Sequence, residues 1–89
     1  MAQQLGDYLR NLREEKGYTT RQLAAMANCS QGLISSIENN RRLPHLPQLW
    51  EIVKALETDF RPALYFLCLD LNIPEAAVAD ILPNDLRLD

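Results

Sequence analysis

Few residues in this sequence could bind a metal or carry out catalysis, because its 89 residues include only two cysteines and one histidine. Cys29 and Cys68 lie far apart and neither belongs to a CxxC pair, so we expect two reduced thiols. His45 has no carboxylate or thiol at ligand spacing. The sequence also shows no nucleophile–base pair, clustered carboxylates or glycine-rich phosphate loop. We therefore expect neither an enzyme nor a metal or other cofactor.

Long hydrophobic segments are missing as well. The apolar run 63–69 has seven residues, far fewer than the roughly 20 that a membrane-spanning helix needs. The first ten residues, MAQQLGDYLR, lack the charged leader and apolar stretch of a secretion signal. We expect no membrane segment and a location in the cytoplasm.

Charge is unevenly distributed along the chain. The net charge of −3 argues mildly against a nucleic-acid partner, because DNA binding depends on neutralising phosphates. Residues 1–42, however, hold six Arg or Lys and four acidic residues, for a net charge of +2. Residues 43–89 hold three Arg or Lys and eight acidic residues, for −5. Positive charge is therefore concentrated in the first half.

Apolar residues recur at helical spacing in that first half and predict three helices. The first covers residues 3–16 and ends at Gly17, which suits a left-handed terminal residue. The second starts at Thr19 or Thr20, and Ser30 caps the third. The expected buried faces consist of Leu5, Tyr8, Leu9 and Leu12, then of Leu23, Ala24, Met26 and Ala27, and then of Ile34 and Ile37.

The outward face of the third predicted helix is small and uncharged. It carries Gln31, Gly32, Ser35, Ser36 and Asn39. A solvated helix surface usually carries Lys and Glu, whereas amides and hydroxyls suit close approach to base edges in a major groove. From this face alone, a base-reading surface and a merely solvated polar face are equally open. Arg41 and Arg42 follow and form a basic turn.

The second half is predicted to hold three further helices. The helix over residues 47–56 contains Trp50, which we interpret as a core or rim anchor rather than a ligand-stacking residue. The next helix opens near Asp59, and its residues 63–69 are apolar all the way round, so it must be covered on more than one side. A short last helix is expected over residues 75–82.

The segment from Leu5 to about Leu69 resembles the Xre/Cro/cI-type helix-turn-helix repressors. The resemblance rests on LRNLREEKGYTTRQLA, the turn NCS, and QGLISSIENNRRLP at their joint spacing. It implies an all-α, five-helix, lambda-repressor-like DNA-binding domain, to which this chain adds a short C-terminal helix. It also implies sequence-specific binding to double-stranded DNA, usually by a dimer on a two-fold-related operator.

The resemblance assigns roles to individual residues. Arg13 and Glu38 match a family ion pair that ties the first helix to the end of the third. The positions that enter the major groove match Gln31, Gly32, Ser35 and Ser36. The positions that contact phosphates match Thr20, Arg21, Asn39, Arg41 and Arg42.

Three departures from the family pattern affect these expectations. Thr20 stands where Gln is frequent, which shortens or removes one phosphate contact. Gly32 stands where a base-reading side chain is common, and it weakens the helix by roughly 0.5–1 kcal/mol relative to Ala. Asn28 and Asn40 stand where the family often has Gly, and both tolerate a left-handed backbone. Few direct base contacts imply low specificity or more reliance on DNA shape.

We divide the chain into a helix-turn-helix DNA-binding domain, 1–70, and a C-terminal helix and tail, 71–89, that extends a dimer interface. The predicted interface residues are Leu64, Tyr65, Leu67, Cys68, Leu71, Val78, Ile81 and Leu82. The expected function is a transcriptional regulator, as a repressor, with double-stranded DNA and a second copy as partners. The alternative is a module of the same fold that binds a protein partner, such as an antitoxin or accessory subunit, with weak or no DNA binding.

Overall fold

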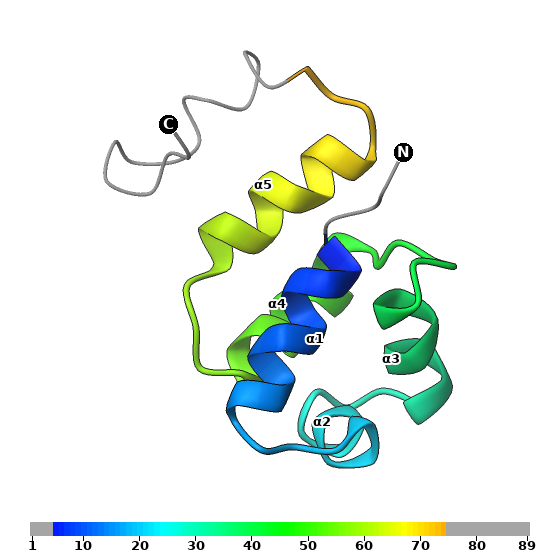
Figure 1. Ribbon diagram of the computed structural model, residues 1–89, viewed down its shortest axis with the longest axis vertical. Helices are drawn as coiled ribbons and strands as arrows, with labels where there is room; N and C mark the ends of the chain where they lie inside the picture. The colour runs from blue at the N-terminus through cyan, green and yellow to red at the C-terminus, as the bar shows by residue number, and fades with distance from the viewer. Residues whose placement is uncertain (1–4, 75–89) are drawn as a thin grey trace.

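A computed structural model describes residues 5–74, which fold into five α-helices and contain no strand (Figure 1). The helices are α1 (Leu5–Glu15), α2 (Thr20–Met26), α3 (Gln31–Glu38), α4 (Leu46–Ala55) and α5 (Phe60–Asp70). This confirms the all-α, five-helix architecture. None of these helices is long and apolar enough to cross a membrane. The additional helix predicted over residues 75–82 lies outside the described residues.

Side chains from all five helices meet in one core. In Figure 1, α1 lies near the centre, with α3 to its right, α2 below it and α5 to its upper left. α1 contacts α3 and α5, whereas α4 contacts α2 and α5. Burial of each large core side chain contributes roughly 1.5–3 kcal/mol. Representative core residues, one from each helix in order, are Leu9, Leu23, Ile34, Ile52 and Leu67.

The predicted N-terminal caps are present. Thr19 Oγ1 accepts a hydrogen bond from the backbone N–H of Gln22, and the Gln22 side chain accepts one from the N–H of Thr19. Ser30 Oγ accepts from the N–H of Leu33 at 3.1 Å, which fixes the start of α3. Asp59 caps α5 through the N–H of Arg61. These bonds satisfy N–H groups that have no partner inside a helix.

Each of the five described helices is followed, two positions after its last residue, by a residue with a left-handed backbone. These residues are Gly17, Asn28, Asn40, Glu57 and Asn72, with φ angles between 54° and 77°. After α2, for example, the N–H of Cys29 returns to the carbonyl of Ala24 at 2.9 Å. This arrangement satisfies the last carbonyls and turns the chain sharply, so the connections between helices stay short. The expectation that Asn28 and Asn40 adopt positive φ is confirmed.

Two apolar side chains near the surface, Met26 and Trp50, test the burial that was predicted from the sequence. The prediction that Met26 lies on the buried face of α2 is wrong, because its side chain is 45% exposed. It lies roughly 100° around the helix from the centre of the face formed by Leu23, Ala24 and Ala27. Trp50 is half exposed and meets the ring of Phe60 edge-on, with centroids 5.4 Å apart. Trp50 is therefore a rim anchor.

α5 is covered more completely by its own chain than the sequence suggests. Leu67 is buried in the main core, which corrects the expectation that it faces a second copy. Tyr65 and Cys68 are also buried, in a second cluster that includes the partly buried Leu64. Leu71, at the end of the helix, is 52% exposed. The remaining predicted interface residues, Val78, Ile81 and Leu82, lie outside the described residues.

The first and last described helices are joined at one end. The carboxylate of Asp70, the last residue of α5, accepts a hydrogen bond from the backbone N–H of Leu5 at 2.9 Å. A negative charge at the start of α1 also complements the helix dipole. The contact fixes α5 across the beginning of α1.

Candidate nucleic-acid interface

α3 presents its small polar face away from the core. Ile34 and Ile37 hold the helix from inside, each with only 2% of its surface exposed. The four residues predicted to read bases lie outside this buried pair: Gln31 and Gly32 are exposed, and Ser35 and Ser36 are partly exposed. A Cβ atom at Gly32 would have only Ser30 Oγ nearby, at 4.0 Å. The face is therefore open at Gly32 and carries one amide and two hydroxyl groups.

A side-chain hydrogen bond links the beginnings of α2 and α3. Gln31 Nε2 donates to Thr20 Oγ1 at 3.0 Å. The hydroxyl proton of Thr20 stays available as a donor, and Gln31 Oε1 stays available as an acceptor. Thr20 is expected to contact a phosphate and Gln31 a base, and this hydrogen bond joins the two side chains. The exposed Arg21 follows Thr20 in the chain.

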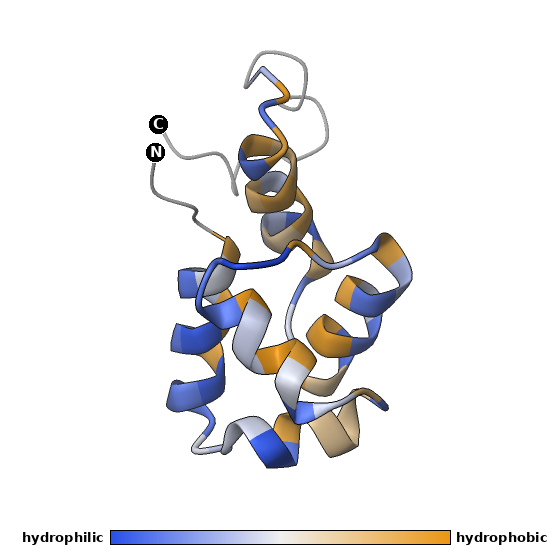
Figure 2. Cartoon of the chain, turned by 90° about the vertical axis from the view of Figure 1, so that its right-hand side faces the viewer, coloured by the Kyte–Doolittle hydropathy of each residue, from blue (hydrophilic) through white to orange (hydrophobic). Residues whose placement is uncertain are grey.

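The turn after α3 provides the other end of the surface. Asn40 has a φ angle of 61°, and the N–H of Arg41 returns to the carbonyl of Ser36 at 2.9 Å. The chain therefore turns away directly after α3, and the side chains of Asn39, Arg41 and Arg42 are exposed. Figure 2 looks at this side of the molecule, where the turn appears as a hydrophilic segment. A helix with its side chains is roughly 10–12 Å across, similar to the width of a major groove.

Positive charge without a partner gathers on this side. Within residues 5–74, no hydrogen bond or ion pair is made by the side chains of Arg21, Arg41 and Arg42. By contrast, Lys54 pairs with Glu51 at 3.2 Å, and Arg61 pairs with Asp59. The exposed and unpaired arginines flank the polar face of α3, where they would attract a polyanion.

A buried ion pair fixes α3 to α1. Arg13 donates from Nε and Nη2 to the two carboxylate oxygens of Glu38, and from Nη1 to the carbonyl of Tyr18. Glu38 is only 3% exposed. The hydrogen bond to Glu38 raises the pKa of the Arg13 guanidinium, which stays charged. The pair expected from the family resemblance is thus present, and it holds the reading helix against the core.

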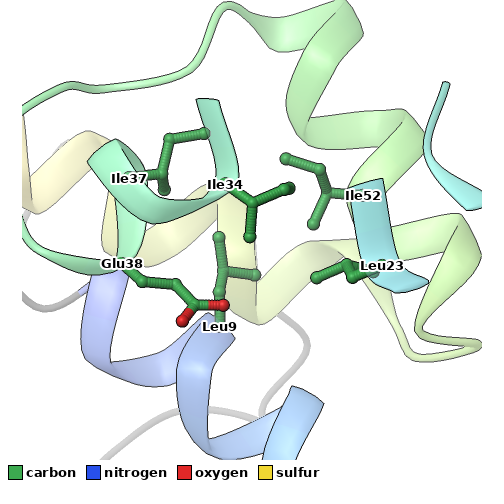
Figure 3. A pocket seen from close by; sticks show the side chains of 6 residues that line it. All are labelled: Leu9, Leu23, Ile34, Ile37, Glu38 and Ile52. Carbon is green, nitrogen blue, oxygen red and sulfur yellow. The ribbon is translucent and has the colours of Figure 1, made fainter. Parts of the chain in front are cut away.

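The side chains around Glu38 leave no room for a ligand. Figure 3 shows it at the edge of a group that consists of Leu9, Leu23, Ile34, Ile37 and Ile52. The space between these side chains does not admit a water molecule.

Sequence reasoning missed two residues that place α1 against the end of α3. A Cβ atom at Gly6 would lie 2.4 Å from both Asn40 Oδ1 and the carbonyl oxygen of Ile37, so this contact requires glycine. Arg10 lies one turn further along and donates to Asn39 Oδ1 at 2.7 Å. Gly6, Arg10 and Arg13 share one face of α1, at spacings i, i+4 and i+7. This spacing in the sequence could have predicted that Gly6 and Arg10 face the same partner as Arg13.

Both cysteines are free thiols, Cys29 partly buried and Cys68 buried. No group of three His, Cys, Asp or Glu side chains within residues 5–74 is arranged to hold a metal ion. Burial raises the pKa of the Cys29 thiol above its ordinary value, which disfavours the thiolate.

Two comparisons with known proteins bear on this surface. The family model described as "Helix-turn-helix domain" matches residues 4–64, a span that includes α2, α3 and the turn after them. An uncharacterized HTH-type transcriptional regulator, y4dJ, of Sinorhizobium fredii (strain NBRC 101917 / NGR234) is 38% identical to this chain over 56 residues. The alignment covers 63% of this chain and 73% of that protein.

Proposed function

The chain belongs to the helix-turn-helix domain family, and on this premise we propose that it regulates transcription by binding double-stranded DNA. α3 would lie in the major groove, with the start of α2 and the turn after α3 against the phosphate backbone. The observation that carries this proposal is the placement of unpaired Arg21, Arg41 and Arg42 around an uncharged polar helix face. The name of the relative in Sinorhizobium fredii supports the same role.

The proposed readout is sparse. Gln31 offers an acceptor and a donor to a base edge, and Ser35 and Ser36 offer hydroxyls that suit several bases. Gly32 offers no side chain, so the backbone of α3 can approach the base edges closely. We propose that sequence preference depends partly on the shape and deformability of the DNA.

Because one reading face is small, we propose that two copies bind a two-fold-related operator as a homodimer. Half-sites one helical turn apart, about 34 Å, would place both copies of α3 on the same side of the duplex. The exposed Leu71 and the partly buried Leu64, about two helical turns apart, favour an interface along α5. A dimer on an operator that overlaps a promoter would exclude polymerase, so the proposed effect is repression. The activity would belong to the cytoplasm and involve binding only, without catalysis.

DNA binding tests this proposal directly. Affinity is measured for a duplex from the promoter of the chain's own gene and for a scrambled duplex of equal length, over a range of salt concentrations. Specific binding should weaken steeply with salt, with a slope of about −0.9 for each phosphate neutralised. Arg41→Ala should weaken binding to both duplexes alike, whereas Ser36→Ala should reduce the preference for the promoter. Lys54→Ala, which removes a charge from α4, is the matched control. It should change neither the affinity for the two duplexes nor the preference for the promoter.

Equal and weak affinity for both duplexes at low salt would contradict the regulator and favour a module that binds a protein partner. Sedimentation tests the dimer separately. A chain that binds its promoter specifically but sediments as a monomer, with and without DNA, would contradict the homodimer alone.

A further inference from the structure

The side-chain amide of Asn39 is tied to α1 by its oxygen. Arg10 Nη2 lies 2.7 Å from Asn39 Oδ1. A guanidinium has only donors, so the atom that it meets must be the oxygen of the amide. The Nδ2 group, with two N–H donors, therefore occupies the other corner of the planar amide and points away from Arg10.

Arg10 is itself held from the core. Its Nε lies 3.5 Å from Oε1 of Glu38, whose carboxylate is fixed by the two shorter bonds from Arg13. The Arg10 side chain is 40% exposed, and that of Glu38 is 3% exposed. Arg10 thus reaches from a buried anchor to a residue at the surface.

Asn39 lies at a position where a hydrogen-bond donor could bind a DNA phosphate. It caps the end of α3, its side chain is exposed, and the unpaired Arg41 and Arg42 follow closely in the same turn. A phosphate oxygen accepts hydrogen bonds and donates none. A freely rotating amide would present its oxygen to the phosphate part of the time, and that orientation repels the anion.

We infer that Arg10 is a positioning residue for DNA binding: it holds the oxygen of Asn39 and so directs the amide N–H groups to a backbone phosphate. This inference rests on the proposed function and adds to it a residue outside the helix-turn-helix. The positive charge beside the amide oxygen also polarises the N–H groups and strengthens their bond to an anion. Arg10 acts through Asn39 rather than by contacting the phosphate.

A double-mutant cycle on the full chain distinguishes an Arg10 that acts through Asn39 from an Arg10 that contacts the phosphate directly. Arg10→Gln, Asn39→Ala and the double variant are assayed against the promoter duplex and a scrambled duplex of equal length, over a range of salt. Lys16→Gln is the control for lost charge, because Lys16 lies just after the end of α1, is exposed, and makes no side-chain hydrogen bond or ion pair in the described region. Urea unfolding of each variant reports whether α1 still packs on α3.

Each single change should weaken binding to both duplexes by about three- to tenfold, the typical net contribution of one hydrogen bond. The double variant should be no weaker than Asn39→Ala, and the salt slope of Arg10→Gln should equal that of Lys16→Gln. If Arg10→Gln lowers the urea midpoint, Arg10→Lys takes its place in the cycle. Lysine keeps a charge beside Glu38 but has one nitrogen, so it cannot hold both Glu38 and Asn39.

Additive losses in the cycle would overturn the inference, and so would a salt slope that falls by about 0.9 more in Arg10→Gln than in Lys16→Gln. The second result would make Arg10 a direct phosphate contact. Failure of the unmodified chain to bind either duplex would instead overturn the proposed function, and this inference with it.

Discussion

Arg13 holds the carboxylate of Glu38 through two parallel hydrogen bonds, from Nε to Oε2 at 2.8 Å and from Nη2 to Oε1 at 2.9 Å. Both side chains are largely withdrawn from water, with 12% of Arg13 and 3% of Glu38 exposed. The bond from Arg10 to the same carboxylate is longer, at 3.5 Å. The end of the reading helix is therefore attached to α1 mainly through Arg13.

Removal of Arg13 should destabilise the fold strongly. Arg13→Ala leaves Glu38 buried with only the weaker contact to Arg10, and we expect a loss of about 3 kcal/mol in the free energy of unfolding. Lys54→Ala breaks the exposed pair with Glu51 and should cost less than about 0.5 kcal/mol. Urea unfolding of the two variants measures the difference. Similar losses would mean that Glu38 is not held as described.

The two glycines inside helices should respond in opposite ways to alanine. Gly6→Ala places a Cβ 2.4 Å from the backbone oxygen of Ile37, so α1 must move away from α3. We expect a loss of at least about 2 kcal/mol. Gly32→Ala meets only open space and should stabilise α3 by roughly 0.5–1 kcal/mol. Thermal unfolding tests both, and a stable Gly6→Ala variant would show that α1 and α3 are packed less closely.

Glu57 is the residue least suited to its left-handed backbone, with a φ angle of 54° at the end of α4. Glycine adopts this conformation without steric cost, so Glu57→Gly should raise stability by about 0.5–1 kcal/mol. The same change at Glu51, inside α4, should lower it by about 1 kcal/mol. The two melting temperatures should therefore move in opposite directions. Equal decreases would contradict the predicted relief at residue 57.

Asp59 should titrate at unusually low pH. Hydrogen bonds from the side chain and backbone of Arg61 lower the pKa of Asp59 to about 2. Because the folded value lies below the unfolded value of about 3.9, the ionised carboxylate favours the folded state above about pH 4. This contribution is lost as the pH falls towards 2. NMR titration of the carboxyl carbon should show the low midpoint, and Arg61→Gln should raise it towards 4, whereas Lys54→Gln should not. A wild-type midpoint near 4 would exclude the bond to Arg61.

Local rules predicted the helices well because each boundary has its own chemical signal. Ser30 is a polar cap, and Asn28 and Asn40 are residues that tolerate positive φ, so the start and end of the reading helix could be placed from the sequence. The pair Arg13–Glu38 came from the family resemblance. The surface roles of Gln31 and the arginines came from the same resemblance and remain predictions.

Contacts between helices were predicted less well because they depend on relative placement. The importance of Gly6 becomes visible only when the carbonyl of Ile37 is brought next to it. The bond from Gln31 to Thr20 likewise depends on how α2 crosses α3. Leu67 was misplaced because an evenly apolar helix does not reveal which side meets the core.

The bond between Asp70 and Leu5 joins residues 65 positions apart. During synthesis, the reading helix is translated before Asp70, the residue that closes the start of α1. The core also lacks Leu67 until then. The five helices should therefore acquire a stable arrangement together, once α5 has emerged, rather than one after another. A truncated product that ends before α5 would carry the whole helix-turn-helix sequence and still fail to present it.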